Sequence, residues 1–275
     1  MNAAWDRAFS DGLHDGAGRR TVQHMRLGLT ALTTPPWAQD IGTQPEPEQV
    51  LSLLQTADCP LTVLDLPPGM ASPLTLGHPA WAIERHTRQL PLELDRDPVD
   101  DWPSTRRKQM RRAEREGMTA SATDDLDLMV ALHQASRDRK RLSSDEGALK
   151  RLLGELLLEP DTHAWVVRDD TGAPIAGGVF HGAGDARCIY GFGGQFRTEK
   201  RGRSSRATVL LIGTAMRHAA THGAKTFDFG GSQDKGVDRF YAEFGAERIP
   251  KVRLVRIRGW WTPILRWRRP ELFPR

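Results

Sequence analysis

Three side chains near the C-terminal end of the sequence, Asp228, Asp234 and Tyr241, could act on an amine or on a departing group. A carboxylate can steer or deprotonate an ammonium group, and a phenol can donate a proton to a leaving group. The pair Gly230-Gly231 lies between them and lets the backbone turn without Cβ clashes. This segment is therefore the first candidate for a reaction centre.

A strand and a helix must hold these residues. The alternation of polar and aromatic residues over 226–229 predicts a half-buried strand that stops at the glycines. An apolar stripe at i, i+3, i+4 and i+7 predicts a helix over 236–244; its members are Val237, Phe240, Tyr241 and Phe244. Structural roles compete with the chemical ones here. Asp234 stands where an N-cap is common, Asp228 could cap the same helix, and Tyr241 could be a core residue with its hydroxyl at the rim.

The same segment resembles the end of the GNAT acyltransferase fold, whose members commonly carry an FY-x-x-x-G segment after the strand that borders acyl-coenzyme A. Here it reads Phe240-Tyr241-Ala242-Glu243-Phe244-Gly245. The preceding DFGGS and the following Gly245-Ala246 are similar to one branch, the FemAB-like (BioF2-like) acyltransferases that include peptidoglycan aminoacyltransferases. The resemblance covers roughly Trp102 to Arg258.

The resemblance implies that an amine attacks an acyl thioester directly and that Tyr241 protonates the departing thiolate. Peptidoglycan-type members often have lysine at this position, so the tyrosine favours a thioester donor. Backbone N–H groups of the central strand near Tyr190, Gly193 and Gly194 would hold the carbonyl group. The acceptor would bind in a cleft beside Asp234, formed by Gly230, Gly231, Ser232 and Gln233.

The resemblance also implies acyl-coenzyme A as a co-substrate. In GNAT enzymes the helix after the central strand begins with a loop whose N–H groups grip the pyrophosphate. The matching residues here are Arg201, Gly202, Arg203, Ser204, Ser205 and Arg206. Ser204 and Arg206 stand where the family has small residues, which departs from its pattern. A solvated basic loop is the alternative, although three arginines supply the charge that an anion site needs.

Two further clusters have weaker functional interpretations. A helix over 103–117 is strongly cationic through Arg106, Arg107, Lys108, Arg111, Arg112 and Arg115. It could meet a polyanion such as tRNA, but such runs are more often solvated faces. His218 and His222 are spaced i, i+4 without a glutamate or third ligand between or beside them, so no metal site is predicted.

The composition sets broad limits. The 275 residues, 39% hydrophobic and 27% charged, are typical of a soluble globular protein, and no apolar stretch is long enough to span a bilayer. The N-terminal sequence lacks the apolar core of a secretory signal, so we expect a cytoplasmic protein. Cys59 and Cys188 lie in unrelated contexts, which argues against a disulfide framework. A sequence pI of 9.3 with clustered arginine indicates an anionic partner.

The sequence predicts a flexible N-terminus over 1–20, a proline-rich α/β lobe over 21–100, a GNAT-like domain over 101–259 and a tail over 260–275. We expect helices at 46–57, 103–117, 124–141, 145–158, 205–222 and 236–244. Strands are expected at 61–66, 81–94, 164–168, 174–181, 187–192, 225–229 and 251–258, with hairpin turns at 169–172 and 182–185. With the resemblance, this order implies an α/β fold of GNAT type: a mixed, mostly antiparallel sheet flanked by helices, with a smaller partial GNAT-like N-terminal lobe.

The tail combines tryptophans with arginines, a mixture suited to lipid headgroups. Packing on its own domain is the favoured interpretation, because Pro263 and Pro270 limit any helix between them. Peripheral membrane contact through this tail is the alternative.

Together these features predict an acyltransferase that moves an acyl group from acyl-coenzyme A, or a similar thioester carrier, to a small-molecule or saccharide-linked amine. Two alternatives stay open. One is a Fem-type aminoacyltransferase that uses aminoacyl-tRNA, and the other is a catalytically decayed protein that binds polyanions or lipid surfaces.

Overall fold

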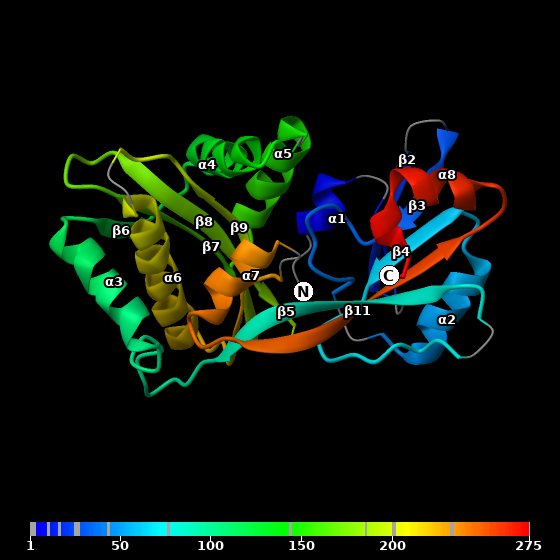
Figure 1. The fold of residues 1–275 in the computed structure, drawn as a ribbon, viewed down its shortest axis with the longest axis horizontal. Helices are drawn as coiled ribbons and strands as arrows, with labels where there is room; N and C mark the ends of the chain where they lie inside the picture. The colour runs from blue at the N-terminus through cyan, green and yellow to red at the C-terminus, as the bar shows by residue number, and fades with distance from the viewer. Residues whose placement is uncertain are drawn as a thin grey trace. The chain divides into compact units, whose positions relative to one another are not determined.

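The structure is a computed structural model that describes residues 4–9, 12–15, 18–24, 28–42, 45–75, 78–142, 145–184, 186–199, 202–231 and 234–274. It divides into two units: unit 1 comprises Phe9–Thr87 and Arg248–Arg275, and unit 2 comprises Asn2–Ala8 and Arg88–Glu247. Each unit is therefore built from separate parts of the chain, whereas the sequence predicts contiguous segments. Figure 1 shows the elements of both.

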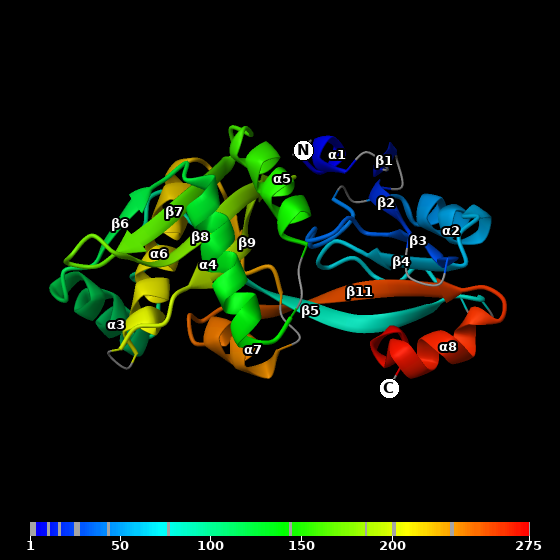
Figure 2. The ribbon, with the colours of Figure 1, turned by 90° about the horizontal axis from the view of Figure 1, so that it is seen from above.

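Unit 1 is a sheet with a helix on each face. Its strands follow the order β1 (Gly12–Asp15), β2 (Gly18–His24), β3 (Thr30–Thr33), β4 (Leu61–Asp65), β11 (Glu247–Ile257) and β5 (Trp81–Pro91). The helices are α2 (Pro47–Thr56), α8 (Trp261–Arg268) and the short 3-10 helix η2 (Pro270–Leu272). Consecutive residues of β11 enter different cores: Leu254 packs with Leu54 of α2, and Val255 packs with Leu265 of α8. Helices α2 and α8 therefore cover opposite faces (Figure 2).

Unit 2 contains the end of β5 and a sheet that continues as β10 (Thr226–Asp228), β9 (Arg187–Gln195), β8 (Pro174–Ala183), β7 (Thr162–Arg168) and β6 (Thr119–Ala122). Its helices are α1 (Ala4–Ala8), α3 (Ser104–Arg115), α4 (Leu126–Arg139), α5 (Glu146–Leu157), α6 (Arg203–Thr221) and α7 (Lys235–Ala242). Helices α3 and α6 cover one face, and α4 and α5 cover the other (Figure 1). Of its strand pairs, β9 and β10 are parallel and joined through α6, and the others are antiparallel.

The predicted fold class, a mixed and mostly antiparallel α/β sheet flanked by helices, is confirmed. Strand β6 was not expected, because its sequence T-A-S-A offers no apolar alternation. Among the described residues, no helix combines the length and the apolar character needed to cross a membrane.

The first residues differ from the expected loose N-terminus. Helix α1 buries Trp5, whose ring lies 5.2 Å from that of His181, and Arg7 bonds with Glu155 and Glu159 of α5 and the residues after it. A five-residue helix is marginal in isolation, so these tertiary contacts explain why it forms.

Aromatic packing joins α7 to α3. The ring of Trp102, just before α3, lies 4.8 Å from that of Phe244, edge to face. Arg106 of α3 is 2% exposed; its guanidinium lies 4.3 Å from the ring centre of Phe240 and bonds Glu243 at 2.6 Å. Arg106 is therefore a structural cation and does not belong to the solvated face of α3.

Helix α4 lies against β9 at a point where only glycine fits. A Cβ atom on Gly194 would lie 2.0 Å from the carbonyl oxygen of Leu132 and 2.6 Å from the amide nitrogen of His133. Both are backbone atoms of α4, so the clash cannot be relieved by a side-chain rotation. Gly194 thus sets how closely α4 approaches the sheet.

Gly194→Ala should therefore lower the free energy of unfolding by about 1–3 kcal/mol or more, because α4 must move away from β9. Gly184→Ala is the matched control, since a Cβ there meets no atom within 4 Å. Chemical denaturation of both variants measures the effect. Equal stability of the two would contradict the close approach.

Candidate functional site

A cavity of about 510 Å3 in unit 2 brings several of the predicted residues together. It is lined by parts of α4, β9, α6 and α7 and by the turn after β10. The predicted residues in its lining are Tyr190, Gly193, Gly194, Ser205, Gly231 and Tyr241. These residues were assigned separately to donor, acceptor and acid roles, and they share one concave surface.

The cavity lies where two parallel strands part. Strand β10 pairs with β9 from Thr226 to Asp228, opposite Arg187 to Ile189, whereas β9 continues to Gln195. Beyond Ile189, β9 keeps its partner β8 on one side, and α4 approaches the other, where Ser136 Oγ accepts a hydrogen bond from Gln195 N–H at 3.2 Å. The unpaired edge of β9 can thus present backbone groups to a ligand.

Tyr241 stands on α7 at the wall of this cavity. Its half-buried ring lies 4.7 Å from that of Phe229 and 6.4 Å from that of Tyr190. Burial raises the pKa of Tyr241, and burial followed by the neighbouring Tyr241 raises the pKa of Tyr190. Both phenols are therefore protonated at neutral pH and can donate a proton or a hydrogen bond.

Asp234 has the capping role that the sequence leaves open. Its Oδ1 accepts hydrogen bonds from the N–H groups of Gly236 (2.8 Å) and Val237 (3.1 Å) at the start of α7. Its Oδ2 lies 2.7 Å from Lys140 Nζ, and the hydrogen bond from Lys140 is the main cause that lowers the pKa of Asp234. The carboxylate is outside the cavity lining, so these contacts favour capping over catalysis.

Asp228 is 2% exposed and closes the turn at the end of β10. One carboxylate oxygen accepts from Gly230 N–H at 2.8 Å, and the other accepts from Gln89 Nε2 at 2.8 Å and Arg187 Nη1 at 3.2 Å. Gly230 and Gly231 both have positive φ, at 76° and 68°, which glycine adopts without strain. Asp228 lies outside the cavity lining, so its contacts favour a positioning role over reaction with an acceptor.

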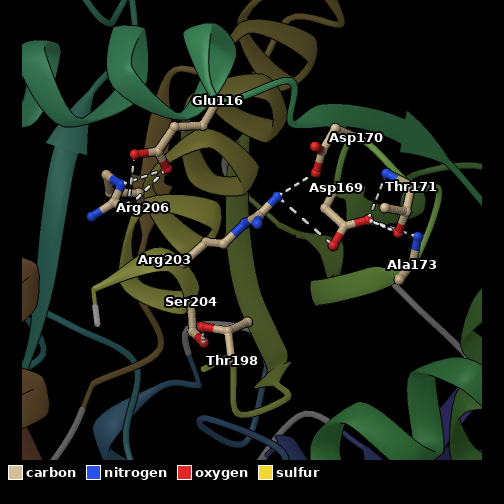
Figure 3. Close-up of polar contacts among 9 residues, drawn as sticks. All are labelled: Glu116, Asp169, Asp170, Thr171, Ala173, Thr198, Arg203, Ser204 and Arg206. Atoms are coloured by element: carbon tan, nitrogen blue, oxygen red, sulfur yellow. Dashed lines mark hydrogen bonds and ion pairs between the residues drawn. The ribbon is translucent and has the colours of Figure 1, made fainter. Parts of the chain in front are cut away.

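The arginines at the start of α6 are bound within the protein (Figure 3). Arg203 lies 2.6 Å from Asp170 and 3.8 Å from Asp169, and Arg206 donates to both oxygens of Glu116 at 2.8–3.0 Å. Ser204 Oγ donates to the carbonyl of Phe196 and contacts Thr198 Oγ1; Gly202 is the N-cap. The positive charges of Arg203 and Arg206, which were expected to attract a pyrophosphate, are therefore balanced by carboxylates.

Three predicted site residues lie outside the described residues: Arg201 of the pyrophosphate loop, and Ser232 and Gln233 of the predicted acceptor site. Of the residues predicted to hold the pyrophosphate, Ser205 lines the cavity, whereas Gly202, Arg203, Ser204 and Arg206 do not. Apart from Ser205, the described residues of this loop thus lie outside the cavity lining.

The cations of the cavity come from α4 and were not predicted. Arg137, Arg139 and Lys140 are in its lining, and no aspartate or glutamate is among the described residues that line it. Lys140 contacts Asp234, and Arg139 Nη2 donates to Ser136 Oγ at 3.3 Å. Burial, followed by the charge of Arg137, lowers the pKa of His133 to about 4, so His133 is neutral at neutral pH. The cavity is therefore suited to an anionic ligand.

A second, smaller cavity of about 200 Å3 contains three histidines. The ring of His218 lies 4.1 Å from that of His163 and 3.9 Å from that of His222, and Asp161 and Cys188 also line this cavity. Among the described residues, no group of His, Cys, Asp and Glu has the arrangement needed to hold a metal ion. Burial first, and the other imidazoles second, lower the pKa of His218 from 6.5 to about 4.

The pair of Glu116 and Arg206 should behave as a structural ion pair. Removing either charge with Glu116→Gln or Arg206→Gln is expected to cost about 1 kcal/mol of stability, and the double variant should cost less than the sum. Burial alone would raise the pKa of Glu116. The hydrogen bonds from Arg206 and Arg112 outweigh this effect, so the pKa of Glu116 is lowered below 4.5. The coupling should be present above pH 4.5 and fade as the pH falls through the lowered value. Additive losses at neutral pH would contradict this pairing.

The cluster formed by His163, His218 and His222 should make the stability of the protein depend on pH. Because the folded protein binds a proton at His218 less readily than the unfolded chain does, stability should fall as the pH drops from about 6.5 towards 4. His218→Gln should flatten this part of the profile. Thermal unfolding of the wild-type chain and of this variant over this pH range provides the measurement, and identical profiles for the two would argue against His218 as the cause.

Comparisons with known proteins agree with this geometry. The sequence profile of the family described as Acetyltransferase (GNAT) domain matches residues 104–241. A sequence comparison with curated proteins gives no significant match.

Several solved structures share the fold. FemX superposes with a TM-score of 0.62 at 14% identity, over 91% of this chain and 86% of FemX. The C-terminal domain of a putative lysylphosphatidylglycerol synthetase from Agrobacterium fabrum gives 0.62 at 12% identity, over 98% of this chain and 91% of that one. A GCN5-related N-acetyltransferase from Kribbella flavida gives 0.50 at 18% identity, over 96% and 99%. The TM-scores show that this chain shares its fold with these proteins.

The matched residues extend from the start of α3 to Tyr241 and thus include every element that lines the larger cavity. The chain belongs to the acetyltransferase (GNAT) domain family.

Proposed function

We propose that the protein transfers an acyl group from an activated, anionic donor to an amine acceptor within the cavity between α4, β9 and α7. The observation that carries this proposal is the parting of β9 and β10, which leaves one edge of β9 beside the hydroxyl-bearing side chains of Tyr190 and Tyr241. An edge of this kind can hold an acyl carbonyl through backbone N–H groups, and a phenol beside it can serve the leaving group.

With a thioester donor the atoms balance as follows. The acceptor nitrogen forms a bond to the carbonyl carbon, and the carbon–sulfur bond breaks. Tyr241 gives its proton to the departing thiolate, and the proton lost by the new amide nitrogen restores the phenol. Burial raises the pKa of Tyr241, so the phenol holds the proton that this step needs, and the position of Tyr241 in the cavity lining is what supports the role.

The charge distribution supports a donor that carries phosphate, such as acyl-coenzyme A or another phosphopantetheine thioester. Arg137 and Arg139 line the cavity, and Arg203 and Arg206, which are paired with carboxylates, are not in its lining. We therefore propose that the anionic part of the donor binds near the C-terminal end of α4, and not through the arginines at the start of α6.

Aminoacyl-tRNA is the second candidate donor. One observation favours it: Arg203 and Arg206, in the loop that matches the family's pyrophosphate loop, are paired with carboxylates here. An amine that is free or linked to a saccharide is the proposed acceptor, in a cytoplasmic setting. A protein that has lost catalysis and binds polyanions is the remaining alternative.

Thermal unfolding with added ligands separates these functions. Acetyl-coenzyme A or longer acyl thioesters should raise the unfolding temperature at saturating concentration, and coenzyme A alone should raise it less. Arg139→Gln should reduce the shift, whereas Arg203→Gln should lower the starting temperature and leave the shift intact. Stabilisation by charged tRNA alone would select the second donor, and stabilisation by any polyanion in equal measure would exclude both enzymatic proposals.

Tyr241→Phe tests the proposed acid directly. Once a productive donor and acceptor pair is identified, this change should lower kcat by about 100-fold or more while leaving the unfolding temperature nearly unchanged. Phe244→Leu, which changes a buried aromatic side chain near Tyr241 that is not in the cavity lining, is the control for packing. Full activity of the phenylalanine variant would dismiss the role of Tyr241 in proton transfer.

A further inference from the structure

Helix α8 and the residues after it are held firmly in unit 1. Leu265 and Leu272 are buried in the core that α8 shares with β4 and β11. Trp81 Nε1 donates to the carbonyl of Leu272 at 2.7 Å, and its ring stacks on Phe273 at 5.3 Å. The tail therefore packs on its own unit, as the sequence predicts. Because one side of α8 is buried in this core, the side chains on its other side face the solvent.

Two tryptophan side chains of the same segment are exposed to solvent. Trp260 is 67% exposed and Trp267 is 79% exposed. Trp260 stacks on Trp261 at 4.2 Å, and a hollow lined by Pro263, Arg266 and Trp267, with one threonine, opens on the outer face of α8. Large aromatic side chains are seldom left this exposed in a soluble protein without a partner.

Uncompensated positive charge surrounds these indoles. Arg258, Arg266 and Arg268 are exposed, and within the described part of the chain none of them is paired with a carboxylate. The nearby acid, Glu271, is bound by Arg269. These exposed arginine and tryptophan side chains therefore suit a partner that is negatively charged and has an apolar region into which an indole ring can insert.

We propose that the surface formed by Trp260, Pro263, Arg266, Trp267 and Arg268 binds the headgroup region of an anionic membrane. Indole rings favour the boundary between headgroups and acyl chains, and guanidinium groups at the same level can bond lipid phosphates. The proposal is independent of the proposed acyl transfer.

A nucleic acid is the alternative partner for this surface. The distribution of positive charge and aromatic side chains over the protein favours a membrane instead. The densest exposed basic face is that of α3, where Lys108, Arg111, Arg112 and Arg115 carry no exposed aromatic residue. The tail has the opposite balance, with fewer cations and the most exposed aromatic side chains of the described residues. Aromatic rings beside a few cations fit a lipid interface better than a duplex backbone.

Co-sedimentation of the full chain with phosphatidylcholine vesicles, with and without phosphatidylglycerol, tests the proposal. Binding should require phosphatidylglycerol and weaken with salt. Trp260→Ser with Trp267→Ser, and separately Arg266→Gln with Arg268→Gln, should each reduce the partition coefficient by about tenfold or more. Leu158→Ser and Arg111→Gln with Arg115→Gln are the matched controls, because they remove an exposed apolar residue and two exposed cations elsewhere.

Unchanged far-ultraviolet circular dichroism and unfolding temperature will show that all variants are folded. Loss of binding in both tail variants, with both controls intact, is the expected result. The proposal is overturned if the wild-type chain ignores phosphatidylglycerol vesicles at low salt, if the α3 control abolishes binding while the tail variants retain it, or if the tail variants lose only RNA binding.

Discussion

Strand β10 is held to β9 over three residues, and the buried carboxylate of Asp228 makes the contacts that end this pairing. Arg187, at the start of β9, donates a hydrogen bond to the carboxylate of Asp228. The N–H group of Gly230 donates to the same carboxylate, in the turn where the chain leaves β10. Arg187 and Asp228 form a buried ion pair, and moving either side chain away would leave a buried charge without its partner, which is costly. This contact thus determines where β10 stops, and β9 continues alone towards the cavity.

The remaining parts of the cavity follow from that point. The turn at Gly230 directs the chain to Asp234, which starts α7 and so places Tyr241 across from Tyr190. On the other side, Gly194 admits the backbone of α4, and the last turn of that helix brings its arginines to the cavity. Arg203 and Arg206 at the start of α6 are paired with carboxylates, and the cations in the cavity lining come from α4 instead.

Much of this could be predicted from the sequence where neighbours in the chain are also neighbours in space. The alternation over 226–229, the two glycines and the apolar stripe of α7 predict the junction, and the capping role of Asp234 is visible from its position. The occupation of Arg203 and Arg206 could not be predicted, because their partners Asp170 and Glu116 are 33 and 90 residues away in the sequence. The contribution of Arg137 and Arg139 was missed for the same reason: the helix is evident, but its placement depends on the long-range contact with Gly194.

The proposed acyl transfer requires the donor to bind along the free edge of β9. Hydrogen–deuterium exchange of the intact chain, with and without a non-reactive thioether analogue of acyl-coenzyme A, measures this binding. We expect slower exchange at the amides of 190–195 and in the last turn of α4, with 203–206 little changed. Protection confined to 203–206, or none at 190–195, would contradict it.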